Sequence, residues 1–334
     1  MHWIGPRTAT TVRAFLAAAL TLTAVNCGST TGQAPQTGAP APNATTAPAQ
    51  QTTTTIPGAR PSPGCQETAT TGTTAPAGPV ERTLTVDGVE RTYLVSTKGT
   101  TRNVPAPVIT LLHGMGSTAA DINRVTDLPD QASAAGTIVV TPQAVGTPTL
   151  WRPAAQGPDA AFLDQILVDL GQTACIDTAR VHVAGFSVGA ALAAAYACAR
   201  QDEIASIVTV TVEAPGGCVD PMPILSFHGT ADPVIAYGNS DPNASGGVTG
   251  TEANMATWAR TAGCQFTPTT TNIGSEVVRL EWPGCRDAAE VVLYRIVGGG
   301  HDWPGKDPAT AVVPSTQQVS ATKEALSFYG RHHQ

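Results

Sequence analysis

A serine framed by glycines is the first feature of this sequence that could do chemistry. Residues 185–189 read GFSVG and lie between an aliphatic run, VHVA, and a run of small helix-forming residues, ALAAAYA. A GxSxG pattern between a strand and a helix is typical of a sharp turn that lifts the serine side chain clear of a sheet. Ser187 would then stand at a helix N-terminus, where free N–H groups favour developing negative charge. We interpret Ser187 as a nucleophile.

A serine hydroxyl attacks only if a neighbouring base takes its proton, so the sequence should also supply a histidine. His301 follows RIVGGG and precedes DWPG, on a loop after the last aliphatic run. His113 and His228 each precede a glycine at the end of an aliphatic run, which favours loop-shaping roles. The other histidines lie in the N-terminal segment, inside a strand or in the terminal tail: His2, His182, His332 and His333. We therefore predict that His301 is the base.

The histidine in turn needs an acid that fixes its tautomer and stabilises the imidazolium. Asp232, in PILSFHGTADPV, follows an aliphatic run and a tight turn. Its position gives the order serine, acid, histidine, which is the chain order of α/β-hydrolases. Two alternatives stay open. Asp before Pro is a frequent turn former, and Glu213, which also follows an aliphatic run, is a second candidate acid.

Attack on an ester carbonyl places negative charge on its oxygen, and N–H donors must already point at that position. The residue after the nucleophile supplies one donor, the backbone N–H of Val188. The early segment LLHGMGS, residues 111–117, is the natural source of the second, through the backbone N–H of Met115. The glycines of this segment could also mark a structural turn alone.

The elements that must position these residues follow from alternating patterns along the chain. An Asp-Gly pair at 87–88 lies between two β-branched runs and predicts a tight hairpin. Short aliphatic runs then alternate with helical patterns at 159–173, 188–200, 251–262 and 316–329. The expected strands are PVITLLHG, IVVTPQ, RVHVAG, ASIVTVTV, PILSFHG and EVVLYRIVGG. This alternation predicts an α/β protein whose mostly parallel sheet carries helices on both faces.

Composition divides the 334 residues into an N-terminal part and one domain. Residues 28–79 are almost entirely Thr, Ala, Pro, Gly, Ser and Gln, and such a segment buries too little apolar surface to offset the entropy of ordering it. We therefore expect a disordered tether over 27–79 and one catalytic domain over 80–334.

The first residues have the layout of an export signal. Two arginines and no acid precede an apolar stretch, residues 14–25, that is too short to span a bilayer. Cys27 follows at the position where a lipoprotein signal is cut and its cysteine acylated. We expect a signal peptide over 1–26 and an extracellular or cell-surface protein whose only attachment to a membrane is a lipid on Cys27. Ordinary cleavage that releases a free secreted protein is the alternative.

Charge and cysteine content limit the kinds of partner and ligand that we expect. The formal net charge is −7 and the 18 Lys and Arg form no run, so we expect no nucleic-acid partner. Of seven cysteines, six remain once Cys27 is set aside, and an exported protein favours their pairing. Six cysteines permit many pairings. None of their spacings is that of a zinc site, and we expect no metal and no cofactor.

The chain resembles the secreted bacterial esterases of the polyhydroxybutyrate depolymerase and feruloyl esterase group. The resemblance rests on HGMG, GFSVG, HGTADPV, GGGHDWPG and the RTLTVDGVERTYLV hairpin, and it covers essentially all of 80–334. It implies an α/β-hydrolase fold with an N-terminal β-hairpin. It also implies hydrolysis of hydroxyalkanoate or hydroxycinnamate esters through an acyl-enzyme, with the roles falling on Ser187, Asp232, His301 and the loop that holds Met115.

The same resemblance implies further features. It indicates a disulfide between Cys264 and Cys285, and it leaves Cys198 with Cys218 and Cys65 with Cys175 as the expected other pairs. No polymer-binding module is apparent, which favours a small or oligomeric ester substrate. Trp151 and Trp303 are candidates for the substrate cleft. Either could equally belong to the core, which we favour for Trp151.

Two other functions remain open. An acyltransferase would use the same three residues and differ only in the second nucleophile. A catalytically inactive lipoprotein could keep the fold for binding at the cell surface. A peptidase is disfavoured, because the chain lacks the large extra domain that such hydrolases usually add.

Overall fold

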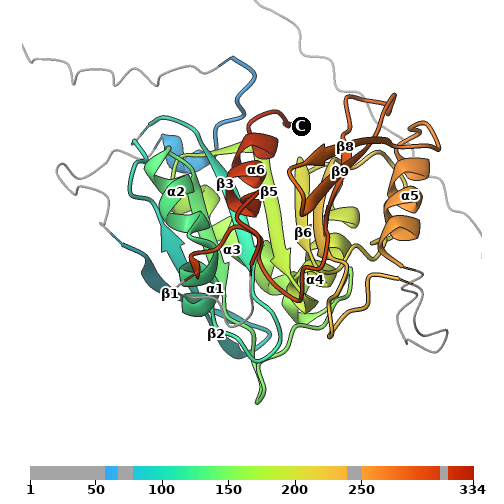
Figure 1. The fold of residues 1–334 in the computed structure, drawn as a ribbon. Helices are drawn as coiled ribbons and strands as arrows, with labels where there is room; N and C mark the ends of the chain where they lie inside the picture. Colours follow the sequence, from blue (N-terminus) through green and yellow to red (C-terminus); the bar gives the residue numbers. More distant parts are fainter. Residues whose placement is uncertain (1–56, 67–77, 102, 239–249, 309–314) are drawn as a thin grey trace, which may run out of the picture. The chain divides into compact units, whose positions relative to one another are not determined.

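A ten-stranded sheet forms the centre of the structure (Figure 1). The computed structural model describes residues 57–66, 78–101, 103–238, 250–308 and 315–334, and all of them belong to the unit that begins at Gln51. The predicted signal peptide and Cys27 lie outside the described residues. Within these residues, no helix combines the length and the apolar character needed to cross a membrane.

The strand order is β1-β2-β4-β3-β5-β6-β7-β10-β9-β8. The strands are β1 (Val80–Val86), β2 (Val89–Ser96), β3 (Ala106–Leu112), β4 (Ile138–Pro142), β5 (Ile176–Phe186), β6 (Ser206–Val210), β7 (Ile224–Gly229), β8 (Thr269–Ile273), β9 (Val277–Trp282) and β10 (Val291–Ile296). The six strands from β4 to β10 in this order run parallel, and an antiparallel pair flanks them on each side. The predicted mostly parallel sheet is confirmed.

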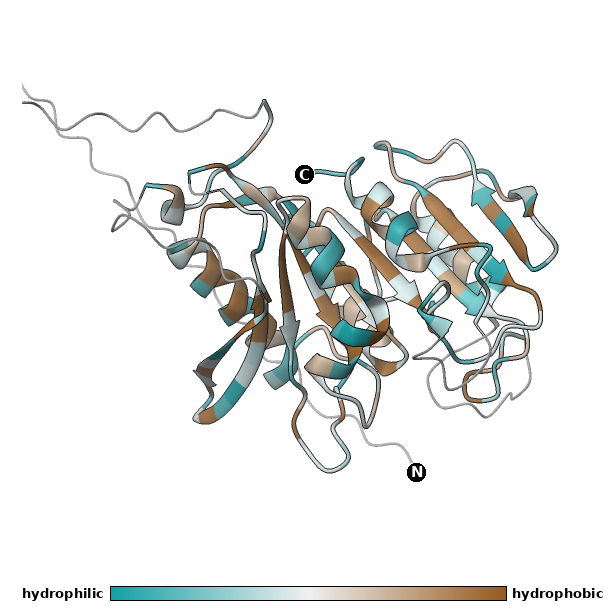
Figure 2. Ribbon diagram, turned by 60° about the vertical axis from the view of Figure 1, so that its left-hand side comes forward, coloured by the Kyte–Doolittle hydropathy of each residue, from teal (hydrophilic) through white to brown (hydrophobic). Residues whose placement is uncertain are grey.

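Helices cover both faces of the sheet. They are α1 (Ala119–Thr126), α2 (Leu128–Ala134), α3 (Pro158–Thr173), α4 (Val188–Cys198), α5 (Thr251–Thr261) and α6 (Ala321–Tyr329). The buried side chains of α1, α2 and α6 pack in one apolar cluster, and those of α3, α4 and α5 pack in a second. The strands between these layers are predominantly hydrophobic (Figure 2), as parallel strands buried on both faces must be. Their carboxyl ends, where parallel strands place loops for a site, lie at one edge.

Most predicted elements are present with shifted ends. The hairpin turns at Asp87 and Gly88, both at positive φ, as a two-residue turn of this kind requires. The helix expected over 316–329 begins only at Ala321, because the Ser320 side chain caps it by accepting from the Lys323 N–H. Helices α1 and α2 and the β8–β9 hairpin were not expected from the sequence; strand β8 is polar and exposed at the sheet edge.

Residues 57–66 are a correction to the expected tether. Cys65 forms a disulfide with Cys175, and Ser62 is buried, with its hydroxyl donating to the Ala174 carbonyl and accepting from the Ile176 N–H. Composition alone predicted disorder because it does not show that a disulfide attaches this segment to the domain. The structure also contains disulfides Cys198–Cys218 and Cys264–Cys285, so all three expected pairs are formed.

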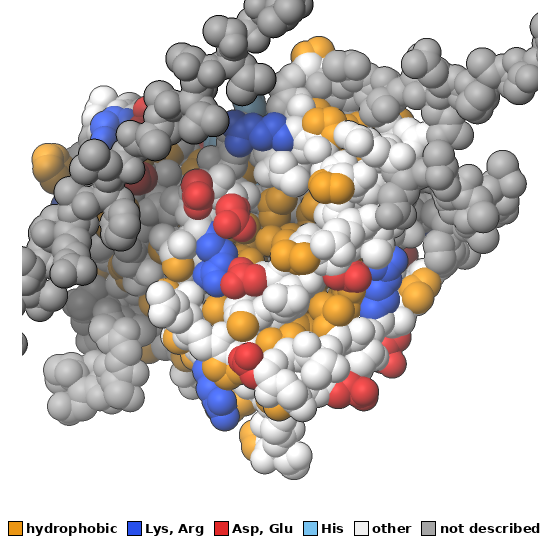
Figure 3. Space-filling view, turned by 180° about the vertical axis from the view of Figure 1, so that it is seen from behind, with side chains coloured by type: hydrophobic (Ala, Val, Ile, Leu, Met, Phe, Trp, Pro, Cys, Tyr) orange, Lys and Arg blue, Asp and Glu red, His pale blue; other side chains and the backbone are white. Residues whose placement is uncertain are grey.

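Charged side chains on the surface are mixed in sign. On the face shown in Figure 3, acidic and basic side chains lie beside one another, with apolar side chains between them. Elsewhere in the described residues, Arg82 pairs with Asp169 and Arg200 with Asp164. On this face the basic residues are therefore accompanied by acidic ones.

Candidate active site

Ser187 stands at the sharp turn between β5 and α4. Its backbone has φ 56° and ψ −126°, a strained conformation for a residue with a side chain, and its N–H donates to the Val210 carbonyl of the neighbouring strand end. Such strain persists only where the surroundings enforce it. The predicted elbow is therefore present.

The two glycines of GFSVG are needed for close approach rather than for an unusual φ. A β-carbon at Gly185 would lie 2.3 Å from the Gly189 carbonyl oxygen, inside the turn itself. A β-carbon at Gly189 would lie 2.5 Å from the Leu112 carbonyl oxygen, where the first turn of α4 crosses the end of β3. Larger residues at either position would push the helix off the sheet.

Asp232 and His301 meet across the ends of two adjacent strands. Asp232 follows β7, His301 follows β10, and these strands pair in parallel. His301 Nδ1 lies 2.8 Å from Asp232 Oδ2, which fits an imidazole N–H donating to the carboxylate. This leaves the other ring nitrogen, Nε2, free of a proton in the neutral ring. The predicted contact between the acid and the base is thus formed.

The loops that carry these two residues are joined by hydrogen bonds. The Ala231 N–H donates to the Gly299 carbonyl at 2.9 Å, and the Gly298 N–H donates to the Thr230 hydroxyl at 2.8 Å. A β-carbon at Gly229 would lie 2.2 Å from the Gly299 oxygen, so this approach requires a glycine. The GGGH and HGTAD segments therefore owe their composition to close packing.

Asp232 is held as a carboxylate. Its side chain is fully buried, and burial alone would raise the pKa. Hydrogen bonds from His228, from His301 and from the N–H groups of Ile235 and Val234 outweigh that penalty and hold the Asp232 pKa well below its ordinary value. The two amides both donate to Oδ1, at 2.9 and 2.8 Å, whereas His301 binds Oδ2. The two carboxylate oxygens therefore have distinct partners.

His301 and the early loop both lie beside the Ser187 turn. The His301 ring packs against Phe186, the residue before Ser187, with ring centroids 5.0 Å apart. On the other side, a β-carbon at Gly114 would lie 3.4 Å from Ser187 Cβ. The structure thus brings together the serine turn, the histidine loop and the loop that holds Met115.

The loop that holds Met115 is fixed by its neighbours. Gly116 N–H donates to the Thr149 carbonyl at 2.8 Å, and the Trp151 indole N–H donates to the His113 carbonyl at 2.9 Å. His113 accepts the Ala144 N–H at Nε2 and contacts the Gly114 carbonyl through Nδ1, so the ring is neutral with its proton on Nδ1. Burial lowers the His113 pKa, which agrees with that state. The expected loop-shaping role of His113 matches these contacts.

The described residues form several cavities of about 370 to 550 Å³, so size alone does not identify the site. The residues that line each cavity do. The larger cavity, 550 Å³, is lined by His301 and by apolar side chains that include Ile122, Phe186, Val234 and Trp303. Trp303 is otherwise buried, with its indole N–H donating to the Thr322 hydroxyl. Trp303 therefore lines the same cavity as His301.

Trp151 does not line this cavity, so the cleft alternative is wrong for it and the core alternative, which the sequence favoured, is confirmed. It is 1% exposed, it packs against His113 with ring centroids 5.1 Å apart, and it is not among the residues that line the cavity. The physical reason is the His113 carbonyl, which is buried and needs a donor. Trp151 belongs to the core and supports the loop instead.

Glu213, the second candidate acid, does not contact His301. Its carboxylate lies 3.0 Å from Nδ1 of His228, and the other nitrogen of that ring faces Asp232. This contact was not expected from the sequence, although a signal was present: His228 stands at the end of β7, four residues before Asp232. Glu213 is thus joined to the site only through His228.

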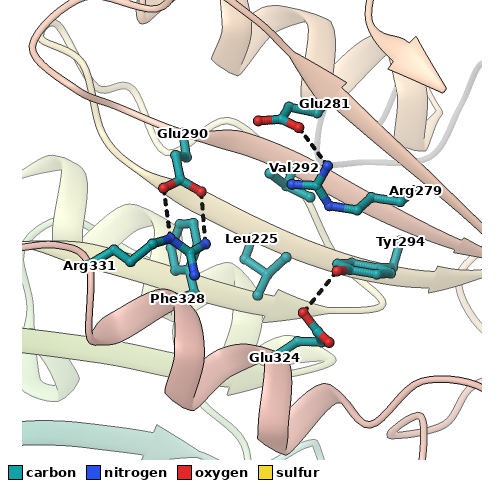
Figure 4. Close-up of a pocket in the computed structure, with 9 residues that line it drawn as sticks. All are labelled: Leu225, Arg279, Glu281, Glu290, Val292, Tyr294, Glu324, Phe328 and Arg331. Carbon is teal, nitrogen blue, oxygen red and sulfur yellow. Dashed lines mark hydrogen bonds and ion pairs between the residues drawn. The ribbon is translucent and has the colours of Figure 1, made fainter. Parts of the chain in front are cut away.

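A second cavity, of about 370 Å³, lies between β7, β9, β10 and α6 (Figure 4). Its polar side chains bond to one another: Arg331 pairs with Glu290, Arg279 pairs with Glu281, and the Tyr294 hydroxyl donates to Glu324. It contains no residue of the site above. Among the described residues, no group of three or more His, Cys, Asp or Glu side chains could hold a metal ion.

Comparison with known proteins finds feruloyl esterases among the similar sequences. No family model matches the chain. Feruloyl esterase D of Neurospora crassa is 27% identical over 247 residues, which cover 68% of this chain and 79% of that protein. Feruloyl esterase C of Emericella nidulans is 34% identical over 153 residues, 44% of this chain and 51% of its own length, so the chain spans about half of that relative.

A solved structure shows the fold. The acetyl xylan esterase from Aspergillus awamori superposes with a TM-score of 0.55 over 75% of this chain and 99% of its own, at 12% sequence identity. At that identity the likeness concerns the fold alone. Together with the mostly parallel sheet and its covering helices, it gives the α/β-hydrolase fold that the sequence predicted.

Proposed function

We propose that this chain, an α/β-hydrolase related in sequence to the feruloyl esterases, is a serine carboxylesterase in which Ser187 is the nucleophile, His301 the base and Asp232 the orienting acid. The observation that carries the proposal is the 2.8 Å contact between His301 Nδ1 and Asp232 Oδ2, beside a serine held at positive φ. These three groups arise from three different strand ends. The strained backbone at Ser187 lowers the stability of the fold. The convergence of the three groups therefore has no evident use in stabilising the fold.

The proposed reaction proceeds in two steps. His301 Nε2 takes the proton of the Ser187 hydroxyl as its oxygen attacks the ester carbonyl carbon, and Asp232 stabilises the resulting imidazolium. The imidazolium returns this proton to the alcohol as it leaves, and an acyl-enzyme remains on Ser187. Water, deprotonated by His301, then attacks the acyl carbon; the bond to Ser187 Oγ breaks, the His301 imidazolium returns the proton to that oxygen, and the acid is released. No metal or cofactor enters this proposal.

Two backbone N–H groups would stabilise the oxyanion, those of Met115 and Val188. Val188 is the first residue of α4, where the N–H has no acceptor within the helix. Met115 lies on the loop beside Ser187, and its side chain is 62% exposed. The amide, not the side chain, is the proposed donor in each case.

Replacement of Met115 tests this assignment. We expect Met115→Pro, which removes the N–H, to lower kcat on p-nitrophenyl butyrate by about 10²–10³-fold, the usual cost of one oxyanion donor. The matched Met115→Ala variant keeps the amide and should stay within about twofold of the wild type. Circular dichroism of both variants checks the fold. Equal activity of the proline variant would remove Met115 from the oxyanion hole.

For the acyl group, we propose hydroxycinnamate-type esters. The cavity beside His301 is about 550 Å³ and is lined mainly by apolar side chains, including the rings of Phe186 and Trp303. An apolar pocket with aromatic walls suits a flat aromatic acid. The names of the relatives point the same way. The hydroxyalkanoate esters of the depolymerase resemblance are the competing outcome of a substrate comparison.

A fluorophosphonate probe tests the function directly. Native protein should be labelled and heat-denatured protein should not, and the label should map to Ser187. Hydrolysis of methyl ferulate, a hydroxybutyrate ester, p-nitrophenyl acetate and p-nitrophenyl butyrate then ranks the acyl groups, and an added alcohol reports any acyl transfer. Native protein that takes no more label than the denatured control would end the esterase proposal.

We further propose that the protein is exported. The structure has three disulfides, and disulfides are typical of proteins that fold in an oxidising compartment. They use six of the seven cysteines, and the seventh, Cys27, follows the signal-like segment. A lipid on Cys27 would account for this odd cysteine and hold the enzyme at the cell surface. Mass spectrometry of the mature N-terminus distinguishes the lipidated form from a free secreted form.

A further inference from the structure

A second buried histidine lies against the Asp232 carboxylate. His228 is 1% exposed, and its Nε2 lies 3.5 Å from Asp232 Oδ2, the oxygen that His301 also contacts. The same nitrogen is 2.9 Å from the carbonyl oxygen of Ile235. Asp232 therefore stands between two imidazole rings, of which only the His301 ring lines the cavity.

The opposite side of the His228 ring faces Glu213. Nδ1 is 3.0 Å from each of the two carboxylate oxygens of Glu213, whose residue is only 2% exposed. The Ser226 hydroxyl donates to the same carboxylate at 3.0 Å, and the Thr251 hydroxyl lies 2.8 Å from Nδ1. Glu213 thus reaches the site through one ring and has no contact with the cavity.

These contacts give His228 a proton on each nitrogen. A backbone carbonyl can only accept, so Nε2 must donate to Ile235, and a carboxylate at 3.0 Å requires the same of Nδ1. Burial alone would lower the pKa of His228, but the hydrogen bonds with Asp232 and Glu213 outweigh it and raise the pKa to about 10. An acceptor at each ring nitrogen together with a raised pKa is the pattern of an imidazolium at neutral pH.

The position of Glu213 is built into the fold. At the end of β6, Thr211 has φ 71°, which is strained for a β-branched residue, and its N–H donates to the Phe227 carbonyl of β7. Two residues later, the Trp258 indole N–H donates to the Glu213 carbonyl at 2.9 Å. A strained turn and a helix side chain together hold this carboxylate under His228.

Two further charged residues near His228, Glu252 and Arg295, pair with each other. The Tyr237 ring meets the His228 ring edge-on, with centroids 5.5 Å apart, and its hydroxyl donates to Glu252 of α5. Arg295, which is the register partner of His228 on β10, pairs with the same Glu252 at 2.9 Å. Among the described residues, the acidic side chains that the His228 nitrogens contact are therefore those of Glu213 and Asp232.

We propose that Glu213 holds His228 as an imidazolium, and that this imidazolium positions the Asp232 carboxylate for His301. The inference rests on the serine esterase function proposed above. Glu213 and His228 are positioning residues, since neither would touch the substrate. Their arrangement has a chemical consequence: a positive ring beside Asp232 offsets part of its negative charge, so His301 loses its proton at a lower pH than it would beside an uncompensated carboxylate.

The double variant Glu213→Gln/His228→Gln tests this inference, because it removes a pair of opposite charges. We expect kcat to fall about tenfold or more, since Asp232 loses a positioning contact, with KM changed less than about twofold. The acidic limb of the kcat/KM profile should move up on the order of one pH unit, because Asp232 is then uncompensated. Rates are divided by the concentration of active sites, which is measured by titration with a fluorophosphonate.

Glu252→Gln is the matched control. It changes a neighbouring glutamate of the same cluster that has no contact with His228, and its acidic limb should coincide with that of the wild type. If the double variant titrates a full complement of sites and its acidic limb does not move, Glu213 and His228 are merely structural and the inference is overturned.

Nitrogen NMR of the wild-type protein provides a readout that needs neither activity nor a variant. With ¹⁵N-labelled histidine, both ring nitrogens of His228 should show protonated shifts at pH 8. A neutral His228 ring at that pH overturns the inference while the esterase function can stand. Conversely, a wild-type protein without esterase activity would end the proposed function, and the NMR result would still decide the state of His228.

Discussion

Ser187→Ala should abolish esterase activity and leave the protein folded. We expect kcat on p-nitrophenyl butyrate to fall by about 10⁴–10⁶-fold, because only the oxyanion hole and substrate binding remain once the nucleophile is gone. The fluorophosphonate label should be lost at the same time. Steady-state kinetics with a site titration measure both effects.

The fold should survive because alanine retains the β-carbon. The strain at φ 56° is a property of any residue with a side chain, so alanine neither adds to it nor relieves it. The backbone bond from residue 187 to the Val210 carbonyl is also kept. We expect the melting temperatures of wild type and variant to agree closely. Activity above about one hundredth of the wild-type value would show that another nucleophile acts.

Asp232→Asn should have the second largest effect, a fall in kcat of about 10⁴-fold, because it reverses the tautomer of His301. The orientation of the asparagine amide is set by its surroundings. The N–H groups of Val234 and Ile235 both donate to Oδ1, so the amide oxygen must occupy that position. The amide nitrogen then takes the place of Oδ2, where it meets His301 Nδ1.

This nitrogen donates where the carboxylate accepted. His301 Nδ1 must then accept, the ring proton moves to Nε2, and the nitrogen that should take the serine proton is blocked. His228 also faces Oδ2 and would meet a second donor there, which destabilises the site further. Kinetics over pH 5–9, with circular dichroism, separate lost catalysis from lost folding. A variant that keeps more than about a tenth of wild-type kcat would show that Asp232 does not orient the base.

The sequence pointed to the candidate site because its residues stand at strand ends with distinctive neighbours. Ser187, Asp232 and His301 each follow an aliphatic run, and glycines that pack against backbone mark the turns around them. Parallel strands bring such ends to one edge, so the order along the chain was enough to predict their proximity. The contact between Asp232 and His301 follows from the pairing of β7 with β10.

What the sequence could not predict depends on packing between distant segments. Trp151 could be assigned to the cleft or to the core until its indole was found bound to the His113 carbonyl. Glu213 stood after a strand, as a catalytic acid would, and only the turn at Thr211 shows that it faces His228. The short helices α1 and α2 have too few residues for a clear period of 3.6.

The disulfide between Cys65 and Cys175 alters where the working unit starts. A recombinant form that begins at Val80, the boundary suggested by composition, would leave Cys175 as an unpaired thiol and strip the Ser62 hydroxyl from the backbone at Ala174 and Ile176. That thiol would invite cross-linking between molecules during oxidative refolding. Preparations that retain the chain from Pro57 onward avoid this hazard and keep the disulfide that closes residues 65–175 into a covalent loop.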